Sequence, residues 1–515
     1  MRHSALLIAL LFPLMSAAQF GTLDNNFDAD GFLTYDVGSS SYTTGYDVAI
    51  QADGKILLLG TTNTPLGLAP YVIRLFPDGS SDLSFGVNGG SALIVNNAEY
   101  DARQMLVQPD GKLVLVGGGV NDGVSGVVVM RLNGVDGFLD ATFGTDGVVH
   151  IPYPEDSYLF DLAIQPDGKI VAVGYSTESD IDLLAVRLNA DGTLDNTFSF
   201  DGKVVTDIND GDGGQAVVIG NDGKITVAGI SFTESGSDAL LVRYNTDGTL
   251  DSTFGANGIV LHEFSSGNSD LQDIVLTATG SMYACGLAEG TGDNDFLVAK
   301  FNTDGTLDNT FAMHGFDRMD IANSDDLANE LLVQPDGRIL AVGYSSVAGD
   351  YSSAMLRYNT NGLLDPTFGN LGQVVTSTFD DESLLEAVTL QADLKIVVAG
   401  SSQAGMTNKG LVARYLSGMN VGIGEVSASI GSTFVYPNPI TNNSITIEYE
   451  LKTDERVSID LLDVTGKRIG VLQQELEESA NRYQKTLQLP VVNSGSYLLR
   501  LNTLNGSVTV KLNVI

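Results

Sequence analysis

Gln165-Pro166-Asp167-Gly168-Lys169-Ile170 is the stretch that decides the fold, because it recurs along the chain at a nearly constant interval. Exact or degenerate copies begin at Gln51, Gln108, Gly220, Thr277, Gln334 and Gln391. The fourth residue of each copy stands at 54, 111, 168, 223, 280, 337 or 394, a spacing of 55 to 57 residues. Self-similarity at a fixed period indicates a repeat architecture, in which each unit is one supersecondary structure packed against its neighbours.

A second anchor runs through the same region, with the pattern Gly-x-Leu-Asp-x-x-Phe and a further Gly four residues later. The clearest copy is 192–198 with Gly202, and the others start at Gly21, Gly79, Gly137, Gly248, Gly305 and Gly362. A large apolar residue fixed at one position of every unit is what packing between neighbouring units needs. The fixed Asp suits a turn in which its side chain accepts local backbone N–H bonds.

Four short runs rich in β-branched residues separate the anchors; in the third unit they are 148–151, 159–164, 170–174 and 183–188. Such runs, bounded by Gly, Asp, Asn or Pro, predict strands. Asp167-Gly168 lies between the second and third runs and predicts a tight hairpin with a primed turn. Four antiparallel strands in each of seven units predict an all-β fold, a seven-bladed β-propeller over residues 19–416. Residues 23–36 fit either the start of the first blade or the last strand of the seventh.

Basic residues are also fixed to the repeat, since 13 of the 17 Lys and Arg between residues 19 and 416 occupy two positions of the unit. The fourth predicted strand carries Arg74, Arg131, Arg187, Arg243, Lys300, Arg357 and Arg414, and the hairpin carries Lys55, Lys112, Lys169, Lys224, Arg338 and Lys395. A ligand site is expected at one or two places, not in every unit. We therefore predict that these residues pair with the carboxylates fixed to the repeat.

The two anchors together resemble the delta-60 repeat family over nearly all of residues 21–416. This resemblance implies an exported bacterial β-propeller, and it implies no catalytic residues.

Residues 1–18 have the pattern of a secretory signal peptide, with a basic start, an apolar run and small residues before Gln19. The apolar run is far shorter than the ~20 residues of a membrane-spanning helix. No later segment is long and apolar enough either, so we expect an exported chain without a transmembrane helix.

The period ends at Arg414, and residues 417–432 form a predicted linker of Gly, Ser, Val and Ala. Residues 433–515 contain several short alternating runs and predict a small Ig-like β-sandwich. They resemble the C-terminal sorting domain of the type IX secretion system, through Val435-Tyr436-Pro437-Asn438-Pro439, Asp463-Val464-Thr465-Gly466-Lys467, Gly495–Leu501 and the ending 511–515. The resemblance implies a Bacteroidetes host, recognition by that secretion machinery, and a place outside the cell or on its outer surface.

The formal charge is −38, from 26 basic and 64 acidic residues, which argues against nucleic acid and anionic membranes as partners. The predicted loops on the face opposite the hairpins differ from unit to unit and are rich in acidic residues. These residues are Glu155, Asp156, Asp207, Asp210, Asp212, Asp270, Asp325, Asp326, Asp380, Asp381, Glu382, Glu178, Asp180, Asp293 and Asp295. The strongest local candidate for a calcium site is Asp207, Asn209, Asp210 and Asp212, because hard cations prefer carboxylate and carbonyl oxygens. The stretch lacks a full EF-hand pattern. The alternative is a solvated acidic face with no cofactor.

Catalytic motifs are sparse in the sequence. Cys285 is the only cysteine, lies in an apolar run and is expected to be a buried strand residue. There is no His-x-x-x-His or Gly-x-Ser-x-Gly pattern and no Trp. We therefore expect a non-enzymatic module that binds an extracellular glycan or protein. Two alternatives stay open: a polysaccharide hydrolase or lyase that uses paired carboxylates, and a structural surface-layer protein.

Overall fold

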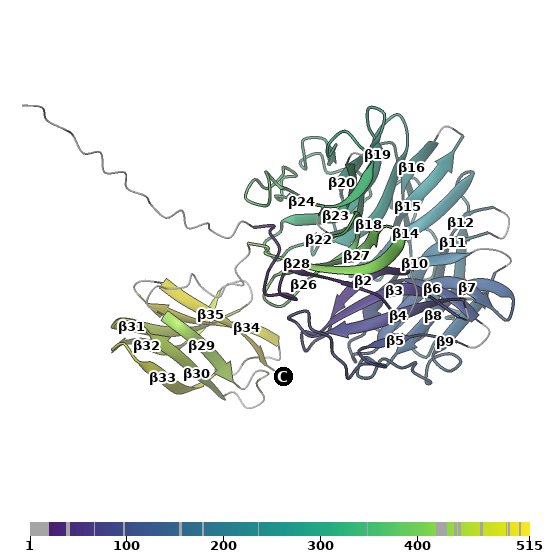
Figure 1. Ribbon diagram of the computed structural model, residues 1–515. Coiled ribbons are helices and arrows are strands. Elements are labelled where there is room, and N and C mark those ends of the chain that lie inside the picture. The colour runs from purple at the N-terminus through teal and green to yellow at the C-terminus, as the bar shows by residue number, and fades with distance from the viewer. Residues whose placement is uncertain are drawn as a thin grey trace, which may run out of the picture. The chain divides into compact units, whose positions relative to one another are not determined.

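The computed structural model of the chain describes residues 20–37, 42–65, 67–95, 98–153, 157–177, 180–234, 236–347, 349–377, 379–418, 430–436, 440, 444–463, 467–490, 492, 495–503 and 506–514 (Figure 1). The predicted signal peptide, 1–18, lies outside these residues. The chain separates into two compact units, one that ends at Gly418 and one of Met419–Ile515. No helix in the described part is long and apolar enough to cross a membrane.

Seven four-stranded antiparallel sheets make up the first unit, and this confirms the predicted propeller. The innermost strands are β2 (Thr43–Ile50), β6 (Ala98–Val107), β10 (Tyr158–Ile164), β14 (Gly211–Ile219), β18 (Ser269–Leu276), β22 (Asp326–Val333) and β26 (Glu382–Leu390). The second strands are β3 (Ile56–Thr64), β7 (Leu113–Asn121), β11 (Ile170–Ser176), β15 (Ile225–Thr233), β19 (Met282–Glu289), β23 (Ile339–Val347) and β27 (Ile396–Ala404). The third strands are β4 (Gly67–Leu75), β8 (Val124–Leu132), β12 (Asp182–Leu188), β16 (Gly236–Tyr244), β20 (Asn294–Phe301), β24 (Asp350–Tyr358) and β28 (Thr407–Tyr415). The outer strands are β5 (Gly90–Ala92), β9 (Val148–Pro152), β13 (Lys203–Thr206), β17 (Ile259–His262), β21 (Phe316–Met319), β25 (Gln373–Thr376) and β1 (Phe32–Tyr35).

The ring closes through the first strand of the chain. Each inner strand contacts the inner strand of the next blade, and β26 contacts β2. β1 pairs antiparallel with β28, from Phe32 opposite Ala413 to Tyr35 opposite Gly410. The N-terminal strand therefore completes the seventh blade, which settles the choice that the sequence left open. By the same logic, the first predicted strand of each unit is the outer strand of the blade before it.

The hairpin between the second and third predicted strands is confirmed, but its turn is not of the primed kind. The N–H of Gly168 donates to the carbonyl of Gln165 (2.9 Å), and the N–H of Gln165 donates to the carbonyl of Lys169 (2.8 Å). Gly168 has φ +84°, while Asp167 does not have a positive φ. This is a type I turn followed by a left-handed Gly, the usual three-residue hairpin loop, and Pro166 at its first central position suits only that geometry. In the seventh blade Leu394 holds the left-handed position, at φ +64°.

The Phe of the second anchor packs between blades, as predicted. Phe85, Phe143 and Phe198 are fully buried, each in a cluster that draws residues from its own blade and the next. Phe27, near the chain start, does the same between the seventh and first blades. The anchor thus supplies one large apolar contact to each interface between blades.

The basic residues fixed to the repeat pair with the anchor Asp, as predicted. In the third blade, Arg187 Nε lies 2.7 Å and Lys169 Nζ 3.2 Å from Asp195 Oδ2, and Arg187 Nη1 donates to the carbonyl of Thr246 in the next blade (2.6 Å). Asp195 Oδ1 accepts the N–H and the hydroxyl of Thr197 (3.1 and 2.7 Å). All seven blades repeat the pair at 2.7–2.9 Å; the pairs are Arg74–Asp82, Arg131–Asp140, Arg187–Asp195, Arg243–Asp251, Lys300–Asp308, Arg357–Asp365 and Arg414–Asp24. The hairpin therefore lies on the same face of the propeller as the connector, the segment between the third and outer strands of a blade that carries the anchor Asp.

The second unit is a small β-sandwich, as predicted. One sheet contains β29 (Ile430–Tyr436), β30 (Ser444–Leu451) and β33 (Arg482–Gln488); the other contains β32 (Arg468–Glu478), β31 (Glu455–Asp463), β34 (Gly495–Thr503) and β35 (Gly506–Val514). Ile447, Ile459 and Leu499 belong to its single core. β29 starts inside the predicted linker 417–432. The motif residues 437–439 and 464–466 lie outside the described residues.

Candidate functional site

Every inner strand carries a β-bulge at the same position, which places one extra residue per blade around the centre of the ring. The register shifts between Gly45 and Asp47 in the first blade, and at the corresponding place in the other six. The bulged residues are Tyr46, Arg103, Phe160, Gln215, Gln272, Asn329 and Glu386. All seven line one cavity of about 190 Å³, which we call the axial pocket. Bulges re-aim side chains and are frequent beside functional sites.

Four carboxyls beside the bulges each tie their own blade to the next one. Oδ2 of Asp47, Asp161 and Asp273 accepts a backbone N–H of the following blade, at 2.7, 2.7 and 2.9 Å. Glu330 Oε2 accepts the N–H of Val388 in the same way. Burial raises the pKa of Asp47 to about 7, of Asp161 to about 8 and of Asp273 to about 6, and it holds the pKa of Glu330 well above its usual range. These carboxyls are therefore structural ties whose pKa is raised by burial.

Arg103 and Glu386 supply opposite charges to the axial pocket. The Arg103 guanidinium lies 4.1 Å from the centre of the Tyr46 ring, and its Nε lies 3.3 Å from Asp101 Oδ2. Burial raises the pKa of Glu386 to about 7, although the charge of Arg103 acts in the opposite direction. In the described part of the chain, Glu386 is not held by a hydrogen bond of the kind that fixes Asp47.

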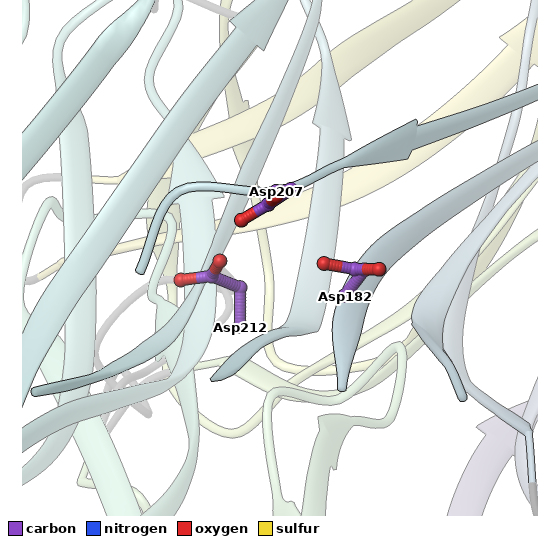
Figure 2. A group of neighbouring side chains, drawn as sticks. All are labelled: Asp182, Asp207 and Asp212. Carbon is purple, nitrogen blue, oxygen red and sulfur yellow. The ribbon is translucent and has the colours of Figure 1, made fainter. Parts of the chain in front are cut away.

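A second candidate site lies among the loops on the face opposite the hairpins. Figure 2 shows Asp182, Asp207 and Asp212 with their carboxylates turned toward one another. One oxygen from each lies within 4.8 Å of the others. We call this group the first acidic trio. Asp182 begins β12, Asp207 follows β13 and Asp212 lies in β14, so the trio joins the third blade to the fourth.

Burial differs within the first acidic trio. Asp182 and Asp212 are buried and Asp207 is exposed, which leaves the group open to solvent on one side. Asp212 Oδ2 accepts the N–H groups of Ile208 and Asn209 (2.7 and 3.1 Å). Its Oδ1 is buried and has no hydrogen-bond partner among the described residues.

Only two of the four predicted calcium ligands, Asp207 and Asp212, lie in this group. The amide nitrogen of Asn209 donates instead to Ser231 Oγ (2.9 Å). Asp210 is an exposed residue of the loop between β13 and β14. Asp182 was missed because it is distant in sequence and belongs to another loop. Alignment of the repeat units would have found Asp182. It stands five residues before Arg187, and Asp295 stands five residues before Lys300 two blades later.

A second acidic trio, Asp295, Asp320 and Asp326, occupies the equivalent place between the fifth and sixth blades. There the chain supplies its own cation. Arg318 Nε lies 3.0 Å from Asp295 Oδ2, and Arg318 Nη1 donates to the carbonyl of Glu289 (2.8 Å). Burial raises the pKa of Asp326 to about 7, and the charges of Asp320 and Asp295 add to this effect.

Cys285 is fully buried in β19, as predicted, and burial raises the pKa of its thiol well above the usual range. The possible metal-binding groups within the described residues contain Asp alone, without His or Cys.

Comparison with known protein families identifies both parts of the chain. The family described as domain of unknown function (DUF5122) beta-propeller matches residues 51–85, 108–143, 165–198, 220–254, 277–311 and 334–368. The family described as secretion system C-terminal sorting domain matches residues 434–515. The six matched segments each run from the hairpin to the anchor Phe. The seventh such segment starts at Gln391 and is completed by Gly21–Phe27, so the two ends of the propeller share it.

Several solved structures match the chain at low sequence identity, and the search of curated proteins found no match. Sqt1 from Chaetomium thermophilum is 11% identical with a TM-score of 0.39, and the match covers 76% of this chain and 99% of that one. A PL25 ulvan lyase is 9% identical with a TM-score of 0.27, over 94% and 95% of the two chains. The polysaccharide lyase Uly1 is 10% identical with a TM-score of 0.30, over 89% and 99%. Matches this distant carry no functional argument.

The sorting domain connects the protein to export, since domains of this kind interact with the type IX secretion machinery of Bacteroidetes and direct proteins to the outer surface or the exterior. The chain is therefore a secreted β-propeller built from DUF5122 repeats and followed by a secretion-system C-terminal sorting domain.

Proposed function

We propose that the propeller is an extracellular binding module whose ligand enters the axial pocket. The observation that carries the proposal is the ring of bulged residues. The repeat keeps its hairpin and anchor residues nearly constant from blade to blade, whereas the bulge position holds Tyr, Arg, Phe, Gln, Gln, Asn and Glu in turn. A scaffold position is expected to repeat, and a position that contacts a ligand is expected to differ around the ring.

The chemistry of the ring favours a small polar ligand. Gln215 and Gln272 offer amide donors and acceptors, while Tyr46 and Phe160 offer aromatic surfaces. The amide nitrogen of Asn329 donates to the carbonyl of Leu385 in the next blade (2.8 Å), which leaves its oxygen as an acceptor. At about 190 Å³ the axial pocket is smaller than a typical site for a drug-sized molecule. We infer that it takes one sugar unit of a glycan, or one side chain of a peptide, with the rest of the ligand outside.

A hydrolase or lyase that acts on an extracellular polysaccharide is the second candidate. It is favoured by Glu386, whose pKa of about 7 suits a general acid or base at neutral pH. Against it, the other carboxyls of the axial pocket, Asp161, Asp273 and Glu330, accept backbone N–H groups of the next blade, so burial in the scaffold accounts for the rise in their pKa. We therefore place binding first.

The test is a glycan array and a peptide library probed with the full chain, followed by an assay for release of reducing ends. Replacement of Gln215 and Gln272 by Ala should abolish binding, while Glu263→Gln, at an exposed acid outside the axial pocket, should not change it. Product release that Glu386→Gln abolishes would establish the enzyme instead. Ligand binding that survives the double replacement would refute the axial pocket as the site. Ordered arrays without a ligand would favour a surface-layer role.

A further inference from the structure

We infer that the first acidic trio, Asp182, Asp207 and Asp212, is a calcium site independent of the axial pocket. Three carboxylates that meet within 4.8 Å repel one another unless a cation joins them. The buried Oδ1 of Asp212 has no hydrogen-bond partner among the described residues, although its other oxygen accepts two backbone N–H groups. A buried carboxylate oxygen without a donor is costly, and a bound cation would satisfy it.

The ligand set of the trio favours calcium over magnesium. Three carboxylates supply the oxygens, and exposed Asp207 leaves an open side for water ligands. Calcium accepts six to eight oxygens in a flexible geometry, whereas magnesium demands a near-ideal octahedron and is usually held by one or two carboxylates. Both features fit the larger and more flexible ion.

The second acidic trio provides the independent argument that this arrangement holds a cation. The Arg318 guanidinium lies 3.0 Å from Asp295. Arg318 stands opposite Leu297 in β20, and the residue at the equivalent register in the third blade is Val205, opposite Leu184. Val205 brings no charge. Lys203, two residues before Val205 in β13, places its Nζ 3.6 Å from Asp201 Oδ2 instead. The chain thus supplies a cation to one trio, and at the other an ion from solution takes that place.

This comparison gives a pair of reciprocal variants. Calorimetric titration of the full chain with calcium chloride at pH 8 should show one site, with Kd in the range of about 10⁻⁴ to 10⁻³ M typical of extracellular modules. Asp207→Asn should weaken binding at least tenfold. Val205→Arg should abolish binding, because an internal guanidinium then occupies the trio. Arg318→Val should raise the stoichiometry from one to two. Asp207 and Val205 are exposed, so these replacements leave the core intact.

Asp210→Asn is the matched control, because it removes an exposed acid from the loop between β13 and β14 that also carries Asp207. This variant should bind calcium like the parent chain. Magnesium chloride should bind more weakly than calcium in every variant that has a site. The inference is overturned if the parent chain shows no heat of binding at about 10 mM calcium, ten times the weakest extracellular class. It is also overturned if Asp207→Asn or Val205→Arg binds calcium as the parent chain does. Loss of glycan or peptide binding in the axial pocket would leave these results unchanged, so the two proposals can fail separately.

Discussion

Asp195, Lys169 and Arg187 form a clamp that joins the hairpin, the connector and the next blade. Asp195→Asn tests whether this clamp stabilises the propeller. Asp195 is 3% exposed and its Oδ2 accepts from both Arg187 and Lys169. Burial by itself would raise the pKa of this carboxyl, but the hydrogen bonds from Thr197 and Lys169 and the charge of Arg187 lower it from 3.8 to about 2. That difference corresponds to about 2 kcal/mol of stability at pH 7.

Asparagine keeps an oxygen for Thr197 but leaves the Arg187 guanidinium buried without its counter-charge. Breaking one side of a buried pair costs about 3–5 kcal/mol, and the remaining bond from Arg187 to Thr246 moderates the loss. We therefore expect a loss of about 2–4 kcal/mol. For a domain of this size, in which 1 kcal/mol shifts Tm by roughly 1 to 2 °C, thermal unfolding of the full chain should show Tm lowered by roughly 2 to 8 °C.

The pH dependence separates this mechanism from a packing defect. A carboxyl whose pKa is lowered by folding contributes stability above its unfolded pKa of 3.8, and this contribution disappears as the pH falls through the folded pKa of about 2. The difference between Asp195→Asn and the parent chain should thus be complete at pH 7 and shrink between pH 4 and 2. Asp191→Asn, at an exposed Asp of the same connector, is the control. Equal Tm values for the two variants, or a difference that ignores pH, would refute the clamp.

Three further predictions concern the turn, the interface between blades and the carboxyls beside the bulges. Leu394→Gly should raise stability by about 1 kcal/mol, because Leu394 has φ +64° and Gly adopts that conformation without strain, whereas Gly168→Leu should lower it by a similar amount; urea unfolding of both variants checks the pair. Phe27→Ala should lower the free energy of unfolding by about 3–5 kcal/mol, as should Phe198→Ala, since both rings are fully buried between blades; a much smaller effect at Phe27 would show that the chain start is not part of the ring. The free energy of unfolding should fall as the pH rises from 6 to 8. The raised pKa values of Asp47, Asp161 and Asp273 mean that the folded chain binds more protons than the unfolded chain in that window. Urea unfolding midpoints that rise over the same pH range would contradict this prediction.

The repeat made most of the propeller predictable from sequence. Gly192–Phe198 and Gln165–Lys169 are local patterns whose turn chemistry and buried ring act the same way in every blade, so the period determined the blade count. The turn type was wrong because Asp-Gly was read without Pro166, which moves the turn back by one residue. The way the ring closes could not be predicted, since β1 and β28 lie at opposite ends of the propeller and nothing local to either strand specifies the other.

The candidate sites were less predictable, for a physical reason. A bulge such as that at Phe160 appears only when strand registers are known, so the axial pocket left no mark in the sequence. The first acidic trio combines Asp182 with Asp207 and Asp212 from loops of two blades, and a search along contiguous sequence found only the latter two. Strand β32 of the sandwich was missed because its Arg468–Glu478 segment is largely polar and exposed, without the alternation that marks a half-buried strand.

The pairing of β1 with β28 also determines when the propeller can become complete. Phe32 and Ala413 are partners at opposite ends of the repeat array. The free-energy cost of closing a loop grows only slowly with its length, but pairing over so long a separation slows folding. Until the N-terminal strand arrives, the open edge of β28 presents unpaired backbone groups, which can associate with other chains. For an exported protein this edge makes the seventh blade the vulnerable step of assembly, and it also means that both ends of the propeller leave from one blade while the other six are continuous in sequence.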